Sequence, residues 1–172
     1  NLSDIEVVTM DMWEAFRNAT ETCVPQADIV HDRFHIAQHL NKAVDIIRRA
    51  ENKKLVKQED ERLKKTTYIW LKAPEKLTEK QQVIFDQLVK DKTLNTVQSW
   101  ELKENFKPFF DYNDKDEALL FFNDWKEKVT KSCLKPIIKV ADMIEKHLDR
   151  MLNYATHKVS NAMAECKNAS IQ

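Results

Sequence analysis

The sequence predicts a predominantly α-helical protein with a partial α/β unit of two strands at its start, interrupted by a large all-helical insertion. Two observations support this class. From residue 34 onward, apolar residues recur at helical spacing, whereas the first 34 residues hold two short apolar runs around one helical segment. The 172 residues also include no glycine, so tight left-handed turns are costly and long helices are favoured.

The lack of glycine also limits the chemistry. Phosphate-binding P-loops and Rossmann dinucleotide sites both need glycine-rich turns, so enzymes of both classes are poor candidates. No apolar run approaches the ~18–20 residues of a membrane helix, and the first residues do not combine a charged segment with an apolar stretch, so we expect no secretion signal in this sequence. The three cysteines lie far apart, which is typical of reduced thiols, and we expect a cytoplasmic protein.

Charge is balanced overall but unevenly distributed. The chain has 28 basic and 28 acidic residues, which gives a net charge of zero. Residues 1–40 hold two basic and seven acidic side chains, whereas residues 41–65 hold nine basic and five acidic ones. Proteins that only coat nucleic acid are usually basic throughout. An acidic start followed by a basic helix is instead compatible with an acid-lined site beside a DNA path.

The first elements form a strand–helix–strand unit. The run IEVVTM at 5–10 predicts a buried strand, and Trp13, Phe16, Ala19 and Thr20 have helical spacing within a helix over 13–24. Pro25 ends this helix, and ADIVHDRF at 27–34 predicts a second strand. Strands joined through a helix in this way are expected to be parallel.

Helices follow for the rest of the chain. They are predicted from Phe34 to about Lys54, over 59–71, from a Thr78 cap to about Asp91, over 94–107, over 115–131, from a Ser132 cap to beyond Met151, and from Ser160 or Asn161 to Gln172. Two parallel strands alone do not make a stable sheet. We therefore expect this chain to be a piece of a longer protein.

Candidate catalytic residues follow the predicted strands. Asp11 ends the first strand, Asp32 and His35 follow the second, and Glu165 lies on the final helix. Catalytic groups gather at the carboxyl ends of parallel strands. Carboxylates from strand ends and from a packed helix suit a two-metal site for phosphoryl transfer.

Two alternatives apply to these residues. Asp11 is also suited to cap the helix that follows it. His31, His35 and His39 lie four residues apart, but a zinc site needs three or four converging ligands and His31 lies in the strand, so zinc is disfavoured. We expect His31 and His39 to be partly exposed. His35 is expected to orient Asp32, contact a phosphate or cap the strand–helix junction.

Four ordered blocks carry a resemblance: VVTMDMWEAF, VPQADIVHDRFHIAQHLNKAVDIIRR, TTYIWLKAPEKLTEKQ and SNAMAECKN. Together they resemble the DDE transposases of bacterial insertion sequences, specifically the ISL3 family. The resemblance implies a ribonuclease-H-like catalytic domain over 1–35, an all-helical insertion over 36–156, and a catalytic-domain helix over 157–172.

The resemblance also implies site roles. Asp11 corresponds to the second acid of the catalytic triad and Glu165 to the third, which hold two magnesium or manganese ions. Asp32 and His35 match a D-x-x-H signature. The first acid is expected upstream of Asn1, so this chain alone is expected to be inactive.

The implied partners are transposon-end and target DNA and a second copy of the protein. The candidate DNA-binding residues are Lys42, Arg48, Arg49, Lys53, Lys54, Asn161 and Asn168. The four tryptophans are predicted to be core residues. The rival interpretation is a non-catalytic helical module that binds nucleic acid or another protein, in which Asp11 and Glu165 have no reason to meet.

Overall fold

The computed structural model describes residues 1–159, which group into two compact units. The first unit comprises Asn1–Ala37, Pro108–Phe122 and the described residues from Met143 onward; the second comprises Gln38–Lys107 and Asn123–Asp142. The described part of the chain is predominantly helical and has one two-stranded sheet, as predicted. Its helices include none that is long and apolar enough to cross a membrane.

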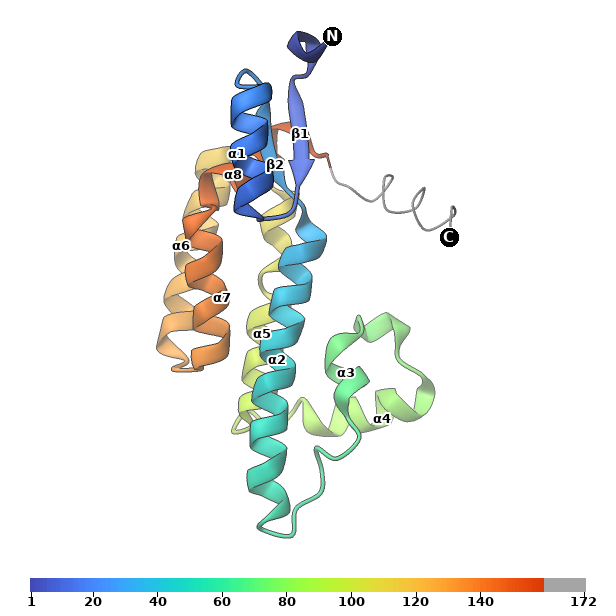
Figure 1. Cartoon of the computed structure of the whole chain (residues 1–172). Coiled ribbons are helices and arrows are strands. Elements are labelled where there is room, and N and C mark those ends of the chain that lie inside the picture. Colours follow the sequence, from blue (N-terminus) through green and yellow to red (C-terminus); the bar gives the residue numbers. More distant parts are fainter. Residues whose placement is uncertain (160–172) are drawn as a thin grey trace. The chain divides into compact units, whose positions relative to one another are not determined.

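Figure 1 shows the elements in sequence colours. In chain order they are η1 (Leu2–Asp4), β1 (Val7–Met10), α1 (Glu14–Cys23), β2 (Asp28–His31), α2 (Arg33–Val56), α3 (Thr67–Leu71), η2 (Pro74–Lys76), α4 (Glu79–Leu88), α5 (Asn95–Glu104), η3 (Lys107–Asp111), α6 (Lys115–Lys131), α7 (Lys135–Lys146) and α8 (Leu148–His157), where η denotes a 3₁₀ helix.

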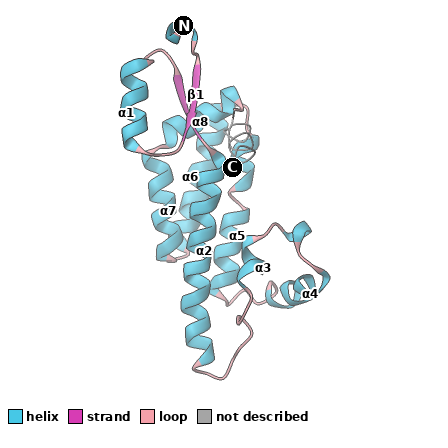
Figure 2. Ribbon diagram, turned by 45° about the vertical axis from the view of Figure 1, so that its right-hand side comes forward, coloured by secondary structure: helices cyan, strands magenta, loops and turns pink. Residues whose placement is uncertain are grey.

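The sheet of the first unit is parallel, as the strand–helix–strand pattern predicts. Strands β1 and β2 lie side by side (Figure 2), with Val7 opposite Asp28 and Met10 opposite His31. Helix α8 packs on β2, where the Asn153 side-chain amide donates to the Ile29 carbonyl at 2.9 Å. Both strands therefore end at the same edge of the sheet, against a helix that holds β2 in place.

Helix α1 differs from its prediction in burial. Every residue of α1 remains at least partly exposed, including the apolar Phe16 and Ala19. Trp13, predicted as a core residue, is 60% exposed, and its ring packs edge-on against Phe16 with centroids 4.7 Å apart. That prediction is wrong because the spacing of apolar residues indicates which side chains share a face and not whether that face is covered.

The core of the second unit is built around Trp70. A cluster of buried apolar residues comprises Val44, Leu63, Ile69, Trp70, Phe85, Leu88, Leu94 and Val97. The Trp70 ring lies 5.9 Å from Phe85 and 6.4 Å from the partly buried Trp100, measured between centroids. Trp125 is also buried, and its indole donates to the Leu102 carbonyl at 2.8 Å. These three tryptophans are core residues, as predicted.

Two predicted helices have different bounds. Over 59–71 only α3 forms, because Glu59 and Lys65 have left-handed backbone angles and the Asp60 carboxylate accepts from the Arg62 amide, which favours a turn. The helix expected beyond Ser132 begins at Lys135 and is interrupted at His147. This interruption separates α7 from α8.

The second unit contains a buried lysine, Lys103, whose burial was not predicted from the sequence. Lys103 on α5 is 6% exposed, and its ammonium donates to the Trp70 carbonyl at 2.7 Å and to the Asn41 side chain at 3.3 Å. It also pairs with Glu104 at 3.2 Å. Burial lowers the pKa of Lys103, and the Glu104 carboxylate opposes that shift. The ammonium thereby joins α2, α3 and α5.

Replacing Lys103 by methionine is expected to destabilise the protein by about 1–3 kcal/mol, because the Trp70 carbonyl loses its donor while the apolar stem still fills the space. Urea unfolding measures this free energy. The matched control is Lys131→Met, since that side chain is 73% exposed, and it is expected to change stability by less than ~0.5 kcal/mol. Equal effects of the two variants would contradict the structural role of Lys103.

His31 is also more buried than predicted. It was expected to be partly exposed, but it is 1% exposed and its ring lies edge-on to His147, with centroids 5.1 Å apart. Burial, reinforced by His147, lowers the pKa of His31 to about 4. Burial and the nearby Arg150 also lower the pKa of His147. The sequence prediction is wrong because β2 is covered on the side where His31 lies.

The low pKa of His31 predicts acid sensitivity. Above pH 6.5 the His31 side chain is neutral in both the folded and the unfolded protein. As the pH falls toward 4, His31 gains a proton in the unfolded chain but stays neutral in the folded protein. Stability is therefore expected to fall by on the order of 3 kcal/mol across this window. His31→Gln should remove this component in urea unfolding across pH, whereas His39→Gln, at an exposed position, should retain it. Identical pH profiles for wild type and His31→Gln would refute the assignment.

Candidate active site

The parallel register brings two of the predicted acids to one edge of the sheet. Met10 lies opposite His31, so the next residues, Asp11 and Asp32, leave the strands side by side. The Asp32 amide donates to the Met10 carbonyl at 3.1 Å, which extends the pairing by one step. The expected grouping of carboxylates at the strand ends therefore has a direct cause in the backbone hydrogen bonds.

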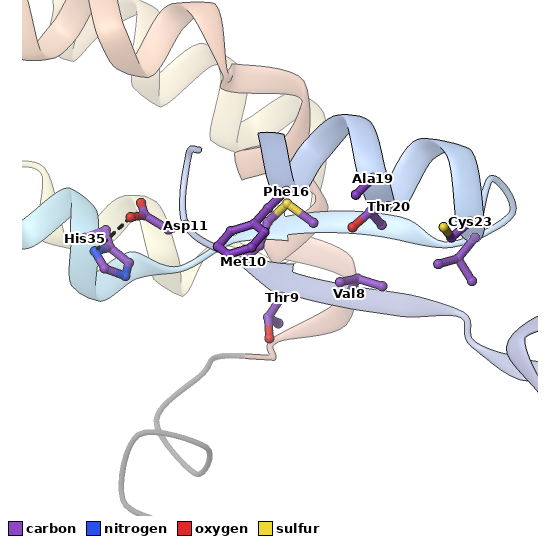
Figure 3. A pocket seen from close by; sticks show the side chains of 10 residues that line it. Val8, Thr9, Met10, Asp11, Phe16, Ala19, Thr20, Cys23 and His35 are labelled. Carbon is purple, nitrogen blue, oxygen red and sulfur yellow. Dashed lines mark ion pairs between the residues drawn. The ribbon is translucent and has the colours of Figure 1, made fainter. Parts of the chain in front are cut away.

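Asp11 is exposed and faces a histidine. Its side chain is 46% exposed; Oδ1 accepts from the Met12 amide at 2.6 Å, and Oδ2 lies 3.7 Å from Nδ1 of His35. Figure 3 shows the two side chains pointing toward each other across the end of β1. The alternative role of Asp11 as a helix cap is wrong, because Trp13 occupies the N-cap position of α1 and makes no side-chain cap bond.

His35 comes from the first turn of α2, and its side chain is 27% exposed. Of the three roles expected for His35, the structure does not show the orientation of Asp32. The ion pair of His35 is with Asp11, while Oδ1 of Asp32 accepts from the Phe34 amide at 3.0 Å. Asp32 itself caps the strand–helix junction, since it directly precedes α2.

Asp32 also has an oxygen without a protein partner. The residue is 2% exposed, and its Oδ2 has no hydrogen-bond partner within the described residues. Buried carboxylate oxygens are rarely left unpaired. Carboxylate oxygens are the ligands that magnesium and manganese prefer, so Asp11, whose side chain is 46% exposed, fits part of a divalent-metal site, and the buried Asp32 adjoins it at the same sheet edge.

Three predicted site residues, Asn161, Glu165 and Asn168, lie outside the described residues. Within 1–159, no group of three or more histidine, cysteine, aspartate or glutamate side chains is close enough to hold a metal ion. Of the histidines considered for zinc, His39 is exposed on α2 and His31 is buried beside His147.

An open pocket of about 520 Å³ adjoins the Asp11–His35 pair. Figure 3 shows the pair at one end of this pocket and Cys23 at the other. The lining comes from β1, α1, the residues that follow each of them and α2: Val8, Thr9, Met10, Asp11, Phe16, Ala19, Thr20, Cys23, Val24 and His35. The carboxylate and the imidazole are thus the ionisable groups at one end of a mainly apolar cavity.

The predicted DNA-binding residues of α2 differ in exposure. Lys42, Arg49, Lys53 and Lys54 are exposed. Arg48 is 7% exposed, and its guanidinium donates to Asp45 from Nε at 3.0 Å and from Nη2 at 2.8 Å. The exposed cations are accessible to phosphates, whereas the burial of Arg48 favours a structural role. Sequence reasoning did not include Lys57, which is also exposed just beyond α2.

Comparisons with known proteins identify the family of the chain. A family model described as "Transposase", for the ISL3 group of DDE transposases, matches residues 1–172. The transposase for insertion sequence element IS1001 of Bordetella parapertussis is 25% identical over 172 residues, which cover 98% of this chain and 42% of that relative. No solved structure matches. Because the family model spans the whole sequence, the chain belongs to the ISL3 family of DDE transposases.

Proposed function

We propose that this chain supplies part of the catalytic domain of a transposase that cleaves the DNA ends of an insertion sequence and joins them to target DNA. The observation that carries the proposal is the exit of Asp11 and Asp32 from one sheet edge, with Asp11 facing His35 at 3.7 Å. Since the chain spans 42% of its curated relative, the activity is proposed for the whole protein.

In this proposal Asp11 and Glu165 hold the divalent ions, magnesium or manganese. Two such ions, when bound, activate a water or a 3′-hydroxyl for in-line attack and neutralise charge on the leaving oxygen. Asp11 suits this role because its side chain is 46% exposed and its Oδ2 is directed toward His35. The remaining acid of the triad is expected upstream of Asn1, so the chain alone is proposed to be inactive.

Asp32 and His35 are proposed as supporting residues. Asp32 fixes the strand–helix junction through the Phe34 amide, while its buried Oδ2 has no hydrogen-bond partner within the described residues. His35 Nδ1 restrains the Asp11 carboxylate, and the partly exposed ring can also donate to a DNA phosphate. The catalytic parts are proposed to be 1–35 and 157–172, with 36–156 as the insertion that positions DNA ends or a second protomer.

One face of α2 is proposed to bind DNA phosphates. Lys42, Arg49 and Lys53 are separated by seven and four residues, so they share one side of the helix, and all are exposed. His39 and Lys57 extend the same row. Four cations, Lys42, Arg49, Lys53 and Lys57, with Arg49 also paired with Asp45 at 3.0 Å, form a sequence-independent contact surface of the kind that follows a phosphate backbone.

The catalytic proposal is tested in the full transposase that contains this chain. Asp11→Asn is expected to reduce cleavage of a donor plasmid in Mg²⁺ by at least ~10³-fold, and His35→Gln by ~10–100-fold, as for a residue that acts through a metal ligand. Asp124→Asn is the matched control, since that side chain is 62% exposed, and it should retain activity. The non-catalytic interpretation predicts instead that Asp11→Asn and the wild type give the same result in this cleavage assay.

The DNA-binding proposal is tested with this chain and a labelled DNA duplex. Lys53→Ala is expected to weaken binding equally for unrelated sequences and to lower the slope of log affinity against log salt by about 1, since one phosphate contact is lost. Lys131→Ala, at another exposed position, should leave the slope unchanged. Fluorescence anisotropy at several salt concentrations measures both, and an unaltered slope for Lys53→Ala would exclude this face.

A further inference from the structure

A second pocket of the first unit has no role in the proposed chemistry. It has a volume of about 330 Å³ and shares no lining residue with the pocket beside Asp11. We call it the His31 pocket. Its lining residues come from the β1–α1 connection, α1, β2 and the end of α7: Met12, Trp13, Glu14, Arg17, His31, Lys146 and His147.

Buried imidazoles with unused hydrogen-bonding capacity line this pocket. His31 is 1% exposed, and neither of its ring nitrogens has hydrogen-bond geometry with a residue within 1–159, although a weak contact with the Met10 backbone partly opposes the lowering of its pKa. Nδ1 of His147 is buried and equally lacks a partner in that range. Each neutral imidazole offers one donor and one acceptor, so together they can serve a polar ligand.

The charges in the His31 pocket favour an anionic ligand. Arg17 and Lys146 contribute two cations from separate helices. The one acid among the lining residues, Glu14, pairs with Arg17 at 3.3 Å and offsets part of that positive charge, so the lining residues keep a net charge of +1. Two cations beside neutral imidazoles disfavour a metal ion and suit a phosphate group, to which arginine and lysine both donate.

An aromatic surface adjoins these cations. Trp13 is 60% exposed, and Phe16 contacts it edge-on at an interplanar angle of 79°. An edge-on neighbour restricts the orientation of the indole without covering it by stacking. A flat aromatic ring beside cations is the arrangement by which proteins hold single nucleotides, with the base on the ring and the phosphate on the cations.

We propose that the His31 pocket binds one unpaired nucleotide of a DNA strand, with its base against Trp13 and its phosphate on Arg17 and Lys146. The imidazoles of His31 and His147 then contact polar atoms of the nucleotide. The assignment to DNA rests on the proposed function. A duplex does not fit this role, because its bases are stacked on one another, and a volume of about 330 Å³ suits one nucleotide.

Direct occupancy is tested by NMR of the indole Nε1–H signals of this chain, with deoxythymidine monophosphate as the probe. Trp13→Phe identifies the Trp13 signal by its loss. The nucleotide is expected to shift that signal and to leave those of buried Trp70 and Trp125 in place. Inorganic phosphate alone should shift it far less. A Trp13 signal that does not respond to the nucleotide would overturn the proposal.

Strand binding is tested with a labelled single-stranded hexathymidylate. Trp13→Ala is expected to weaken binding by ~5–150-fold, the range for loss of one base–aromatic stack, and Lys146→Glu should also weaken it. Tyr68→Ala is the matched control because Tyr68 is 65% exposed, and it should bind within two-fold of wild type. Wild-type affinity in Trp13→Ala, or no binding of the strand at all, would sink the proposal.

The proposed function and the proposal for the His31 pocket can be refuted independently. Trp13→Ala should leave binding of a blunt duplex unchanged, whereas Lys53→Ala should weaken it. If Asp11→Asn retains full cleavage activity while Trp13→Ala still loses single-strand binding, the catalytic proposal falls and the pocket stands. If Asp11→Asn abolishes cleavage and Trp13→Ala changes no nucleic-acid affinity, the pocket proposal falls alone.

Discussion

Strand β1 pairs with β2 in parallel, with Met10 opposite His31, and the rest of the first unit depends on this register. Ile29, Val30 and His31 are all buried, so both faces of β2 are covered, and a shift by one residue would exchange these faces and separate Asp11 from Asp32. Helix α8 stabilises the register from the other side, since Asn153 bonds the Ile29 carbonyl and His157 pairs with Asp28 at 2.8 Å. The candidate active site is thus fixed by backbone pairing, and its side chains add local adjustment.

The same pairing relates the two pockets of the first unit. Asp11 and His35 line one, while Met12, Trp13 and His31 line the other, so the residues that follow β1 contribute to both. The two pockets differ in chemistry: the first is mainly apolar with a carboxylate–imidazole pair, and the second combines cations, neutral imidazoles and an exposed indole. The two proposed roles, cutting a DNA strand and holding an unpaired nucleotide, are compatible within one protein.

Much of this architecture was predictable from the sequence. The strands, the α1 and α2 helices, the Thr78 cap and the 115–131 helix follow from apolar spacing and capping residues, and the structure confirms them. Burial was harder to predict: His31 and Lys103 are polar residues that tertiary packing covers, and Trp13 is an apolar one that packing leaves exposed. Such outcomes depend on contacts between distant segments, which local patterns do not encode. Glu165, Asn161 and Asn168 lie outside the described residues.

Within residues 1–159 the chain makes left-handed turns without glycine, at Glu59, Lys65, Cys133 and Lys158. Each such residue costs roughly 1–2 kcal/mol of backbone strain. The unfolded chain, however, is also less free than one containing glycine, and each glycine avoided spares about 0.4–1 kcal/mol of conformational entropy on folding. Local strain in the native state is therefore offset by a smaller entropy loss along the whole sequence, so the composition favours the folded state even where individual turns oppose it.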